Sequence, residues 1–145
     1  MARCMRIWHP GCYYHIISRG TRRLEIFQDD EDFITFLNLL KGIKKKYEFS
    51  IEAYCLMSNH YHLLIKAGEY PLSNAMAWIG GNYARYFNKK YEYSGHVFEN
   101  RYKSLLIDDE QYLYQVSNYI HMNPVRAHIV DSPEQYKWSS YKNSY

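Results

Sequence analysis

The pattern of apolar positions predicts four strands and three helices, in the order β-α-β-β-α-β-α. Strands are expected where β-branched and aromatic residues form short runs, at residues 13–19, 49–57, 60–66 and 97–107. Helices are expected where apolar residues recur every three or four positions, at residues 29–47, 71–91 and 108–124. Ser58-Asn59 joins two strands as a hairpin, and residues 125–145 are expected to be mostly loop with a little helix. This order predicts a ferredoxin-like α+β fold, an antiparallel sheet with helices packed on one face.

The third predicted strand carries two histidines separated by one residue. Side chains alternate along a strand, so Tyr61, Leu63 and Ile65 share an apolar face, and His60 and His62 lie together on the opposite face. Two neutral imidazoles about 6–7 Å apart by strand rise form half of a divalent metal site. A pair of surface histidines on a half-exposed strand explains the same short motif. The interpretation as a metal site therefore depends on whether other residues of the chain supply the remaining ligands.

The second predicted helix contains a pair of glycines. Its apolar stripe consists of Leu72, Met76, Ile79, Tyr83 and Phe87. Gly80-Gly81 weakens the helix and is expected to let another backbone pass close by.

The third predicted helix places polar side chains along the edge of its apolar stripe. That stripe consists of Leu113, Val116, Ser117 and Ile120, while Tyr114 and His121 face away and are expected at the surface. Tyr119 and Asn123 are one turn apart on the edge, about 6 Å. Tyr112 lies on the same edge but about 16 Å from Asn123, too far to share a small site. Pro124 disfavours α-helical backbone at Asn123, so Asn123 is expected at a fraying end.

These residues together suggest phosphoryl-transfer chemistry. Two imidazoles and an amide oxygen, from His60, His62 and Asn123, can hold Mg²⁺ or Mn²⁺ and leave positions open for phosphate oxygens. A nearby phenol, that of Tyr119, can then attack a phosphodiester and store the bond as a phosphotyrosine, which allows rejoining without ATP. The alternative for Tyr119 is an aromatic residue packed at the helix edge.

Composition narrows the class of protein without choosing a function. The 145 residues predict one domain, residues 1–145, and 47% hydrophobic content argues against disorder. No apolar run is long enough to cross a membrane, and the start lacks the apolar region of a signal peptide, so a cytoplasmic protein is expected. Cys4, Cys12 and Cys55 show no pairing pattern and are expected to be reduced thiols. A net charge of +3 permits a nucleic-acid partner without requiring one.

Several separated motifs resemble one family in the right order. The segments YHIISRG, IFQDDEDF and YCLMSNHYHLLI resemble the HUH single-tyrosine transposases. The segments GHVFENRYKS, YIHMNPVRAHIV and YKWSSY resemble the REP-associated tyrosine transposase branch of that family. The resemblance spans residues 13–141, nearly the whole chain.

The resemblance implies a ferredoxin-like fold and metal-dependent cleavage and strand transfer on single-stranded DNA that often bears a hairpin. It implies His60 and His62 as metal ligands and a 5′-phosphotyrosine on Tyr119. Insertion-sequence members dimerise, so a homodimer is one expected assembly, whereas the REP-associated branch can work as a monomer. Where insertion-sequence members usually have Gln, this chain has Asn123; Ser58 replaces a frequent Pro, and Tyr61 replaces a smaller aliphatic residue.

Six cationic residues are candidate DNA contacts, with solvated surface charges as the alternative: Arg19, Arg22, Arg23, Arg101, Lys103 and Arg126. Five other histidines lack a partner at ligand spacing and are expected to be structural or at the surface: His9, His15, His96, His121 and His128. The main alternative to an enzyme is a ferredoxin-like module that binds single-stranded nucleic acid without catalysis, using tyrosines to stack on bases.

Overall fold

The computed structural model describes residues 8–99 and 101–142 and contains the predicted elements in the predicted order. The elements are β1 (Tyr13–Arg19), α1 (Asp30–Tyr47), β2 (Ser50–Leu56), β3 (His60–Lys66), α2 (Leu72–Tyr91), β4 (Lys103–Ile107), α3 (Glu110–His121) and α4 (Asn123–Arg126). Short 3₁₀ turns follow β1 (Thr21–Arg23) and precede the C-terminus (Pro133–Gln135).

The four strands form an antiparallel sheet in the order β2-β3-β1-β4, which confirms the ferredoxin-like α+β fold. The strand β4 is shorter than predicted and begins at Lys103 instead of residue 97. Before it, Phe98 makes only an isolated bridge to Gly20, and the Glu99 amide donates to the Arg19 carbonyl at 2.9 Å. The residues before β4 therefore stay attached to the end of β1 without forming a continuous ladder.

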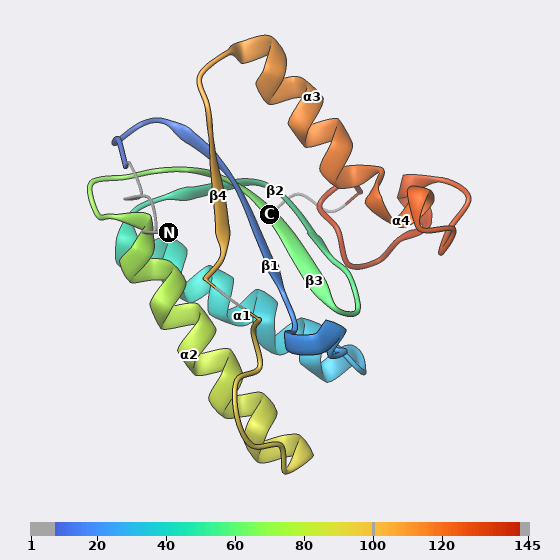
Figure 1. The fold of residues 1–145 in the computed structure, drawn as a ribbon. Helices are drawn as coiled ribbons and strands as arrows, with labels where there is room; N and C mark the ends of the chain where they lie inside the picture. Colours follow the sequence, from blue (N-terminus) through green and yellow to red (C-terminus); the bar gives the residue numbers. More distant parts are fainter. Residues whose placement is uncertain (1–7, 100, 143–145) are drawn as a thin grey trace, which may run out of the picture.

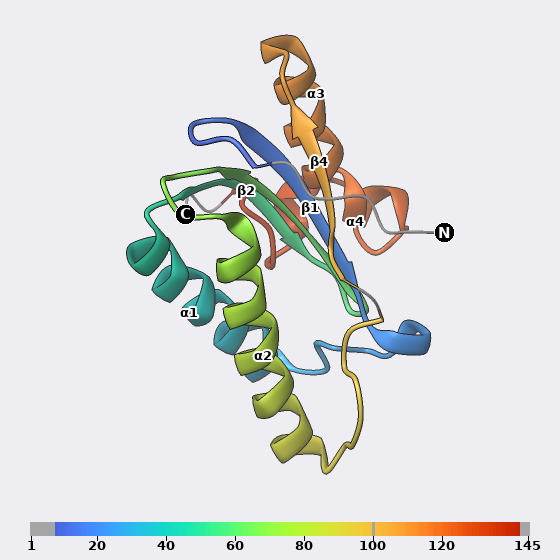
Figure 2. The same ribbon diagram turned by 60° about the vertical axis from the view of Figure 1, so that its left-hand side comes forward.

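The helices α1 and α2 cover one face of the sheet (Figures 1 and 2). Tyr61, Leu63 and Ile65 of β3 point into this face and are 0–2% exposed, as the alternation predicts. The predicted α2 stripe is buried in the same apolar cluster. This layer is the main core of the molecule, because the large buried side chains concentrate here.

The helix α3 packs on the opposite face of the sheet, where Figure 2 shows it across the strands from α1 and α2. Val116 and Ile120 of α3 are buried against Cys55 and Leu64, in a smaller apolar cluster. The expectation that helices pack on one face thus holds for α1 and α2, while α3 lies on the other. A narrow apolar stripe suits a helix that covers only part of a sheet face.

An ion-paired cluster joins the start of α1 to the end of α2. Asp29 precedes α1 as its N-cap, and its side chain accepts from the Asp32 amide at 3.1 Å. Asp32 is fully buried and accepts hydrogen bonds from Tyr86 at 2.6 Å and from Tyr91 and Lys90. Burial alone would raise the pKa of Asp32, but these donors lower it below its ordinary value of 3.8.

The C-terminal segment extends along the edge of the sheet at β2. The Leu56 amide donates to the Trp138 carbonyl at 2.9 Å, and the Ser140 amide donates to the Tyr54 carbonyl at 3.0 Å. The surface position expected for His121 is wrong, because its ring is half-buried with Nε2 2.7 Å from Ser140 Oγ. The segment brings polar groups over this end of α3, and sequence periodicity within the helix could not reveal them.

The structure bears on two predictions made from composition, the state of the cysteines and the absence of a membrane-spanning segment. Cys12 and Cys55 are free thiols, and burial raises the pKa of Cys55 to about 12, so its thiol stays protonated; Cys4 lies outside the described residues. Within residues 8–99 and 101–142, none of the helices is both long and apolar enough to span a bilayer.

Candidate active site

A cavity of about 300 Å³ lies on the α3 side of the sheet, at the end of β1. Its walls are formed by Ile17, Ser18, Arg19, His60, His62, Glu99, Arg101, Lys103, Tyr119 and Asn123. The candidate ligands and the candidate nucleophile share this cavity, although they are up to 63 positions apart in the sequence, from His60 to Asn123. They meet because β3 lies in the middle of the sheet and α3 crosses its outer face.

The two histidine rings of β3 lie 5.2 Å apart between centroids, inclined at 82°. Each has one ring nitrogen held by a neighbour. His60 Nδ1 is 2.7 Å from Asn59 Oδ1, and His62 Nδ1 is 3.0 Å from His15 Nε2. When each Nδ1–H donates to its partner, each Nε2 presents a lone pair, which is the arrangement common among metal-binding histidines.

The environment keeps both imidazoles neutral. Burial, together with smaller contributions from His60, His15 and Arg126, lowers the pKa of His62 to about 3. Burial also lowers the pKa of His60, with a smaller contribution from Arg19. Neutral imidazole is the form that binds metals, so these residues fit a divalent cation without first losing a proton.

The amide of Asn123 adds an oxygen donor to this cavity. The helix α3 ends at His121, and α4 begins at Asn123 with Pro124 in its first turn. Asn123 is therefore not at a fraying end, because proline suits the first turn of a helix and α4 continues the chain. The donor set of two imidazoles and one amide could hold Mg²⁺ or Mn²⁺.

A second group of side chains that could bind a metal lies outside this cavity and consists of carboxylates. Asp29, Glu31 and Asp32 bring carboxylate oxygens within 4.8 Å of one another. Lys90 Nζ lies 2.8, 2.8 and 2.9 Å from these three carboxylates, so an ammonium group already occupies the point where they converge.

Tyr119 lies on the last turn of α3 and faces the histidines. Its ring centroid is 6.0 Å from that of His62 and 6.2 Å from that of His15, and the side chain is 49% exposed. The Arg126 guanidinium lies 4.0 Å from the ring centroid and donates to the Tyr119 carbonyl at 2.7 Å. Tyr112 is also exposed but is not part of the cavity wall. The phenol of Tyr119 is thus both accessible and held in place.

The structure divides the six predicted DNA-contacting cations into three groups. Arg19, Arg101 and Lys103 line the cavity. Arg22 and Arg23 are exposed in the turn after β1, with φ of 51° and 60°, and lie outside the cavity wall. Arg126 stacks on Tyr119. Their roles in binding DNA stay predictions.

Three residues of this site were not singled out by sequence. His15, expected to be structural or at the surface, is buried against His62 and Tyr119 and so lies beside the candidate site. The signal was its place in the alternation of β1, on the same side as Ile17, which pairs with His62. Asn59 fixes His60, and Glu99 adds a carboxylate to the cavity wall. Glu99 could not be placed because the residues before β4 follow no periodic pattern.

Comparisons with known proteins agree with this arrangement. A Haemophilus influenzae protein assigned to the REP-associated tyrosine transposases is 29% identical over 123 residues, covering 76% of this chain and 69% of the relative. A solved REP-associated tyrosine transposase bound to a REP hairpin superimposes with a TM-score of 0.81 at 17% identity, covering 97% of this chain and 83% of the other. A Deinococcus radiodurans protein assigned as a transposase gives a TM-score of 0.57 at 20% identity, covering 82% and 95%.

These structural likenesses concern the fold, and the sequence match identifies the family. The family described as "Transposase IS200 like" matches residues 9–123, which include His60, His62, Tyr119 and Asn123. The chain therefore belongs to the IS200-like transposases, in agreement with the resemblance to REP-associated tyrosine transposases.

Proposed function

We propose that this transposase cleaves and rejoins single-stranded DNA through a covalent bond to Tyr119, with the help of a divalent metal held by His60, His62 and Asn123. The observation that carries the proposal is the cavity itself, where the Tyr119 ring lies 6.0 Å from that of His62. A tyrosine beside a pair of neutral imidazoles is suited to transfer a phosphoryl group to itself.

The reaction balances without an external energy source. The Tyr119 hydroxyl oxygen attacks the phosphorus of a phosphodiester, and the bond from phosphorus to the 3′ oxygen breaks. The proton lost by the phenol is matched by one gained at the departing 3′ oxygen. The products are a 5′-phosphotyrosine and a free 3′-hydroxyl. Attack by a 3′-hydroxyl on the phosphotyrosine reverses these steps, so a strand is joined at no net cost in phosphoester bonds.

The side chains around the cavity supply charge and orientation. Arg19, Arg101 and Lys103 surround the position of the phosphate, where cations offset its charge. Arg126 holds the Tyr119 ring from the side and pins the backbone at the same residue. When bound by His60, His62 and Asn123, Mg²⁺ or Mn²⁺ would polarise the phosphate and stabilise the charge of the transition state.

The preference for single strands and hairpins is supported by the relatives rather than by this cavity. The superimposed REP-associated transposase was solved with a REP hairpin. A DNA partner of that kind fits an exposed phenol beside three cations. Within this chain, the candidate ligands and the candidate nucleophile line the same cavity.

A trapping assay tests the proposal. The protein is incubated with labelled hairpin-bearing single-stranded DNA and Mn²⁺, and products are separated under denaturing conditions. A covalent adduct that disappears on chelation of the metal is the expected result. Chelated protein that forms the adduct as fast as metal-loaded protein would show that the site is misassigned.

The alternative is a binding module without catalysis, which the 17 tyrosines of the chain would suit. That function predicts tight DNA binding with no adduct on any hairpin substrate. The stacked Arg126–Tyr119 pair and the held histidine nitrogens favour the enzyme, because a module that only stacks on bases needs neither.

A further inference from the structure

The glycine pair in α2 does not serve the purpose expected from sequence. A Cβ atom at Gly80 would meet nothing within 4 Å, and one at Gly81 would meet only the Arg85 guanidinium, at 3.6 Å. No backbone passes these glycines among the described residues, so that prediction is wrong. Glycine inside a helix is destabilising relative to alanine, and close packing against the described part of the chain does not explain its presence here.

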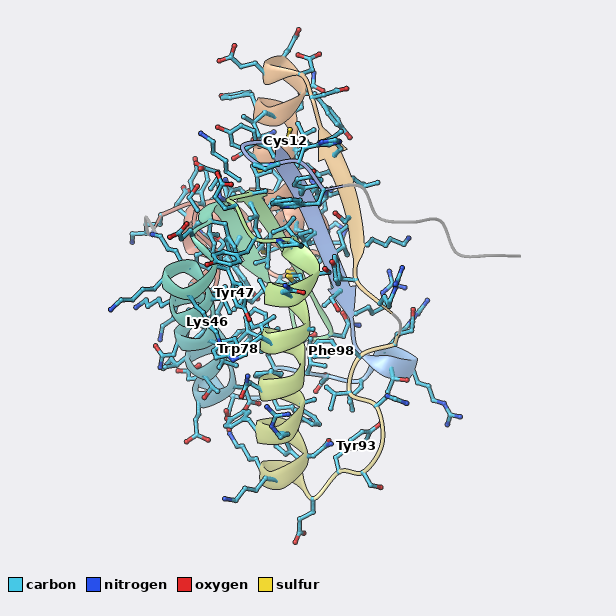
Figure 3. The ribbon with its side chains drawn as sticks, turned by 90° about the vertical axis from the view of Figure 1, so that its left-hand side faces the viewer. Cys12, Lys46, Tyr47, Trp78, Tyr93 and Phe98 are labelled. Atoms are coloured by element: carbon cyan, nitrogen blue, oxygen red, sulfur yellow. The ribbon has the colours of Figure 1, made fainter. Side chains whose placement is uncertain are left out.

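The open space beside Gly80 belongs to a second cavity, of about 310 Å³. This volume is at the lower end of the range for small-ligand pockets. The glycines form part of its α2 wall, together with Ser73, Met76 and Ala77, and aromatic rings come from Phe98 and Tyr102 in the segment that leads into β4. Figure 3 shows Phe98 beside α2, on a different side of the helix from Trp78, whose ring lies against Gly42 of α1.

This second cavity adjoins the candidate active site. Ser18 and Arg101 contribute to the walls of both cavities. A strand of DNA with one phosphate near Tyr119 can therefore place a neighbouring nucleotide beside α2, with the Arg101 cation between the two positions. Arg101 is exposed, so its guanidinium can reach the linking phosphate.

The aromatic wall of the second cavity packs against the main core on the side away from the cavity. The Phe98 ring packs edge-on to Tyr61 at 6.2 Å between centroids and lies 6.3 Å from Tyr83, both in the main core. An aromatic wall opposite a stretch of α2 that carries no side chain at residues 80 and 81 leaves room for a flat ring. Every base has a flat face, and stacking on aromatic side chains is the usual way in which unpaired bases are bound.

We propose that the cavity formed by Gly80, Gly81, Phe98 and Tyr102 binds one unpaired base of the DNA strand whose phosphate occupies the active site. The proposal rests on the function proposed above, because continuity with that site identifies the occupant. In this assignment the glycine pair keeps the slot open, because a side chain at residue 80 would fill the position of the base.

Equilibrium binding tests the slot without relying on cleavage. Fluorescently labelled hairpin DNA with single-stranded flanks is titrated, in EDTA at one salt concentration, against three proteins that all carry Tyr119→Phe. The first has no other change, the second adds Gly80→Leu, and the third adds Asn74→Leu. Asn74 is exposed on the same helix and outside the cavity wall, so the third protein controls for an added leucine.

We expect Gly80→Leu to weaken binding roughly ten- to hundredfold, the range that corresponds to the stacking of one base, and Asn74→Leu to leave it unchanged. A scan with one abasic nucleotide at each unpaired position then identifies the base. Its removal should weaken binding by a similar factor in the protein with glycine and have no further effect in the Gly80→Leu protein.

The proposal is overturned if Gly80→Leu binds as tightly as its parent. It is also overturned if every abasic position costs the same in both proteins, because then no base occupies the slot. If the leucine at residue 80 prevents folding, Tyr102→Leu replaces it in the test. This change keeps apolar volume but removes the ring, so removing the same base should weaken binding when Tyr102 is present and have no further effect in the Tyr102→Leu protein.

These outcomes separate the slot from the chemistry. If the effect of Gly80→Leu depends on one base but the unmodified protein forms no adduct, the base-binding slot is supported and cleavage by Tyr119 is refuted. Adduct formation without that dependence would do the reverse.

Discussion

The two faces of strand β3 are built for different purposes. On one face, Tyr61, Leu63 and Ile65 are 0–2% exposed beneath α1 and α2, in a layer of large apolar side chains. On the other, α3 covers Leu64 with a small apolar cluster, and His60 and His62 line a cavity. Successive residues of β3 therefore alternate between the main core and the face that carries the candidate site.

The difference shows how a small sheet can carry buried imidazoles. Placing polar rings in a poorly hydrated position is costly unless they are hydrogen-bonded. Asn59 and His15 supply those bonds for His60 and His62, while the opposite face supplies most of the apolar burial. We therefore expect changes on the cavity face to remove function with little loss of fold, and changes on the core face to do the opposite.

The largest effect is expected from Tyr119→Phe, which should abolish the covalent adduct. Only a hydroxyl is lost, and the side chain is 49% exposed, so folding, metal binding and DNA affinity should be retained. Tyr112→Phe is the matched control on the same helix and should still form the adduct, since Tyr112 lies outside the cavity wall. Peptide mapping of trapped DNA provides the measurement; a phosphotyrosine at Tyr112 would reverse the assignment.

The second effect concerns the metal. His60→Ala or His62→Ala should abolish cleavage while most DNA affinity remains, because affinity is spread over many cations whereas the metal acts on the reacting phosphate. Asn123→Ala should reduce metal dependence less, since one amide oxygen contributes less to the site than the imidazoles. Filter binding and adduct formation are measured on the same samples; a parallel loss of both would contradict this separation.

Much of the fold was predictable because its signals are local. Alternation located β3 with its two faces, and helical spacing located α1 and α2. The length of β4 was not predictable, since the residues before Lys103 meet the end of β1 through the isolated Phe98–Gly20 bridge and the Glu99–Arg19 hydrogen bond and not through a continuous ladder. Alternation describes a strand's own faces and carries no information on where its partner strand ends.

The candidate site was predictable where one element carries its own geometry. His60 and His62 share a face through strand alternation. Helical spacing also brought Tyr119 and Asn123 together, and both line the cavity although α3 ends at His121 and Asn123 begins α4. His15, Asn59 and Glu99 were missed because their roles depend on contacts between elements, in the pairing of β1 with β3 and in the irregular residues before β4. The environment of His121 was missed for the same reason, since Ser140 comes from the C-terminal segment.

The third prediction tests the core face directly. Leu63 is fully buried beside His62 in sequence but points into the main core. Leu63→Ala should lower the free energy of unfolding by about 2–5 kcal/mol, the usual cost of truncating a buried leucine. Urea unfolding measures this, and adduct formation per folded molecule should stay unchanged. If His62→Ala destabilises the protein as much as Leu63→Ala, the two faces do not differ in the way described.

A smaller effect is expected from His15→Phe, which keeps a stacked ring beside His62 and removes the hydrogen bond to its Nδ1. Partners of this kind orient metal-binding imidazoles, and their loss weakens metal affinity about 10- to 100-fold. Calorimetric titration of Mn²⁺ into protein without DNA measures the change. His15→Gln, which retains a polar side chain, should recover part of the affinity; equal affinity in all three proteins would mean that His15 only fills space.

The smallest effect is a difference in how the two faces respond to acid in metal-free protein. Burial holds the pKa of His15, His60 and His62 below the ordinary value of 6.5, so the unfolded chain takes up protons that the folded chain refuses. Stability should therefore begin to fall as the pH drops below about 6.5 and continue falling toward pH 3.

The core side should respond at lower pH. Hydrogen bonds from Tyr86, Tyr91, Gln28 and Lys90 outweigh burial and lower the pKa of Asp32 below 3.8, so its contribution is complete above that pH and is lost below it. Urea unfolding at pH 7, 5 and 3.5 in EDTA should show a loss between pH 7 and 5 that is reduced in His15→Phe. Asp32→Asn should leave that upper loss intact, because its proton uptake belongs to the lower range. A loss confined to pH below 4 would mean that the histidines on the cavity face are not held neutral by burial.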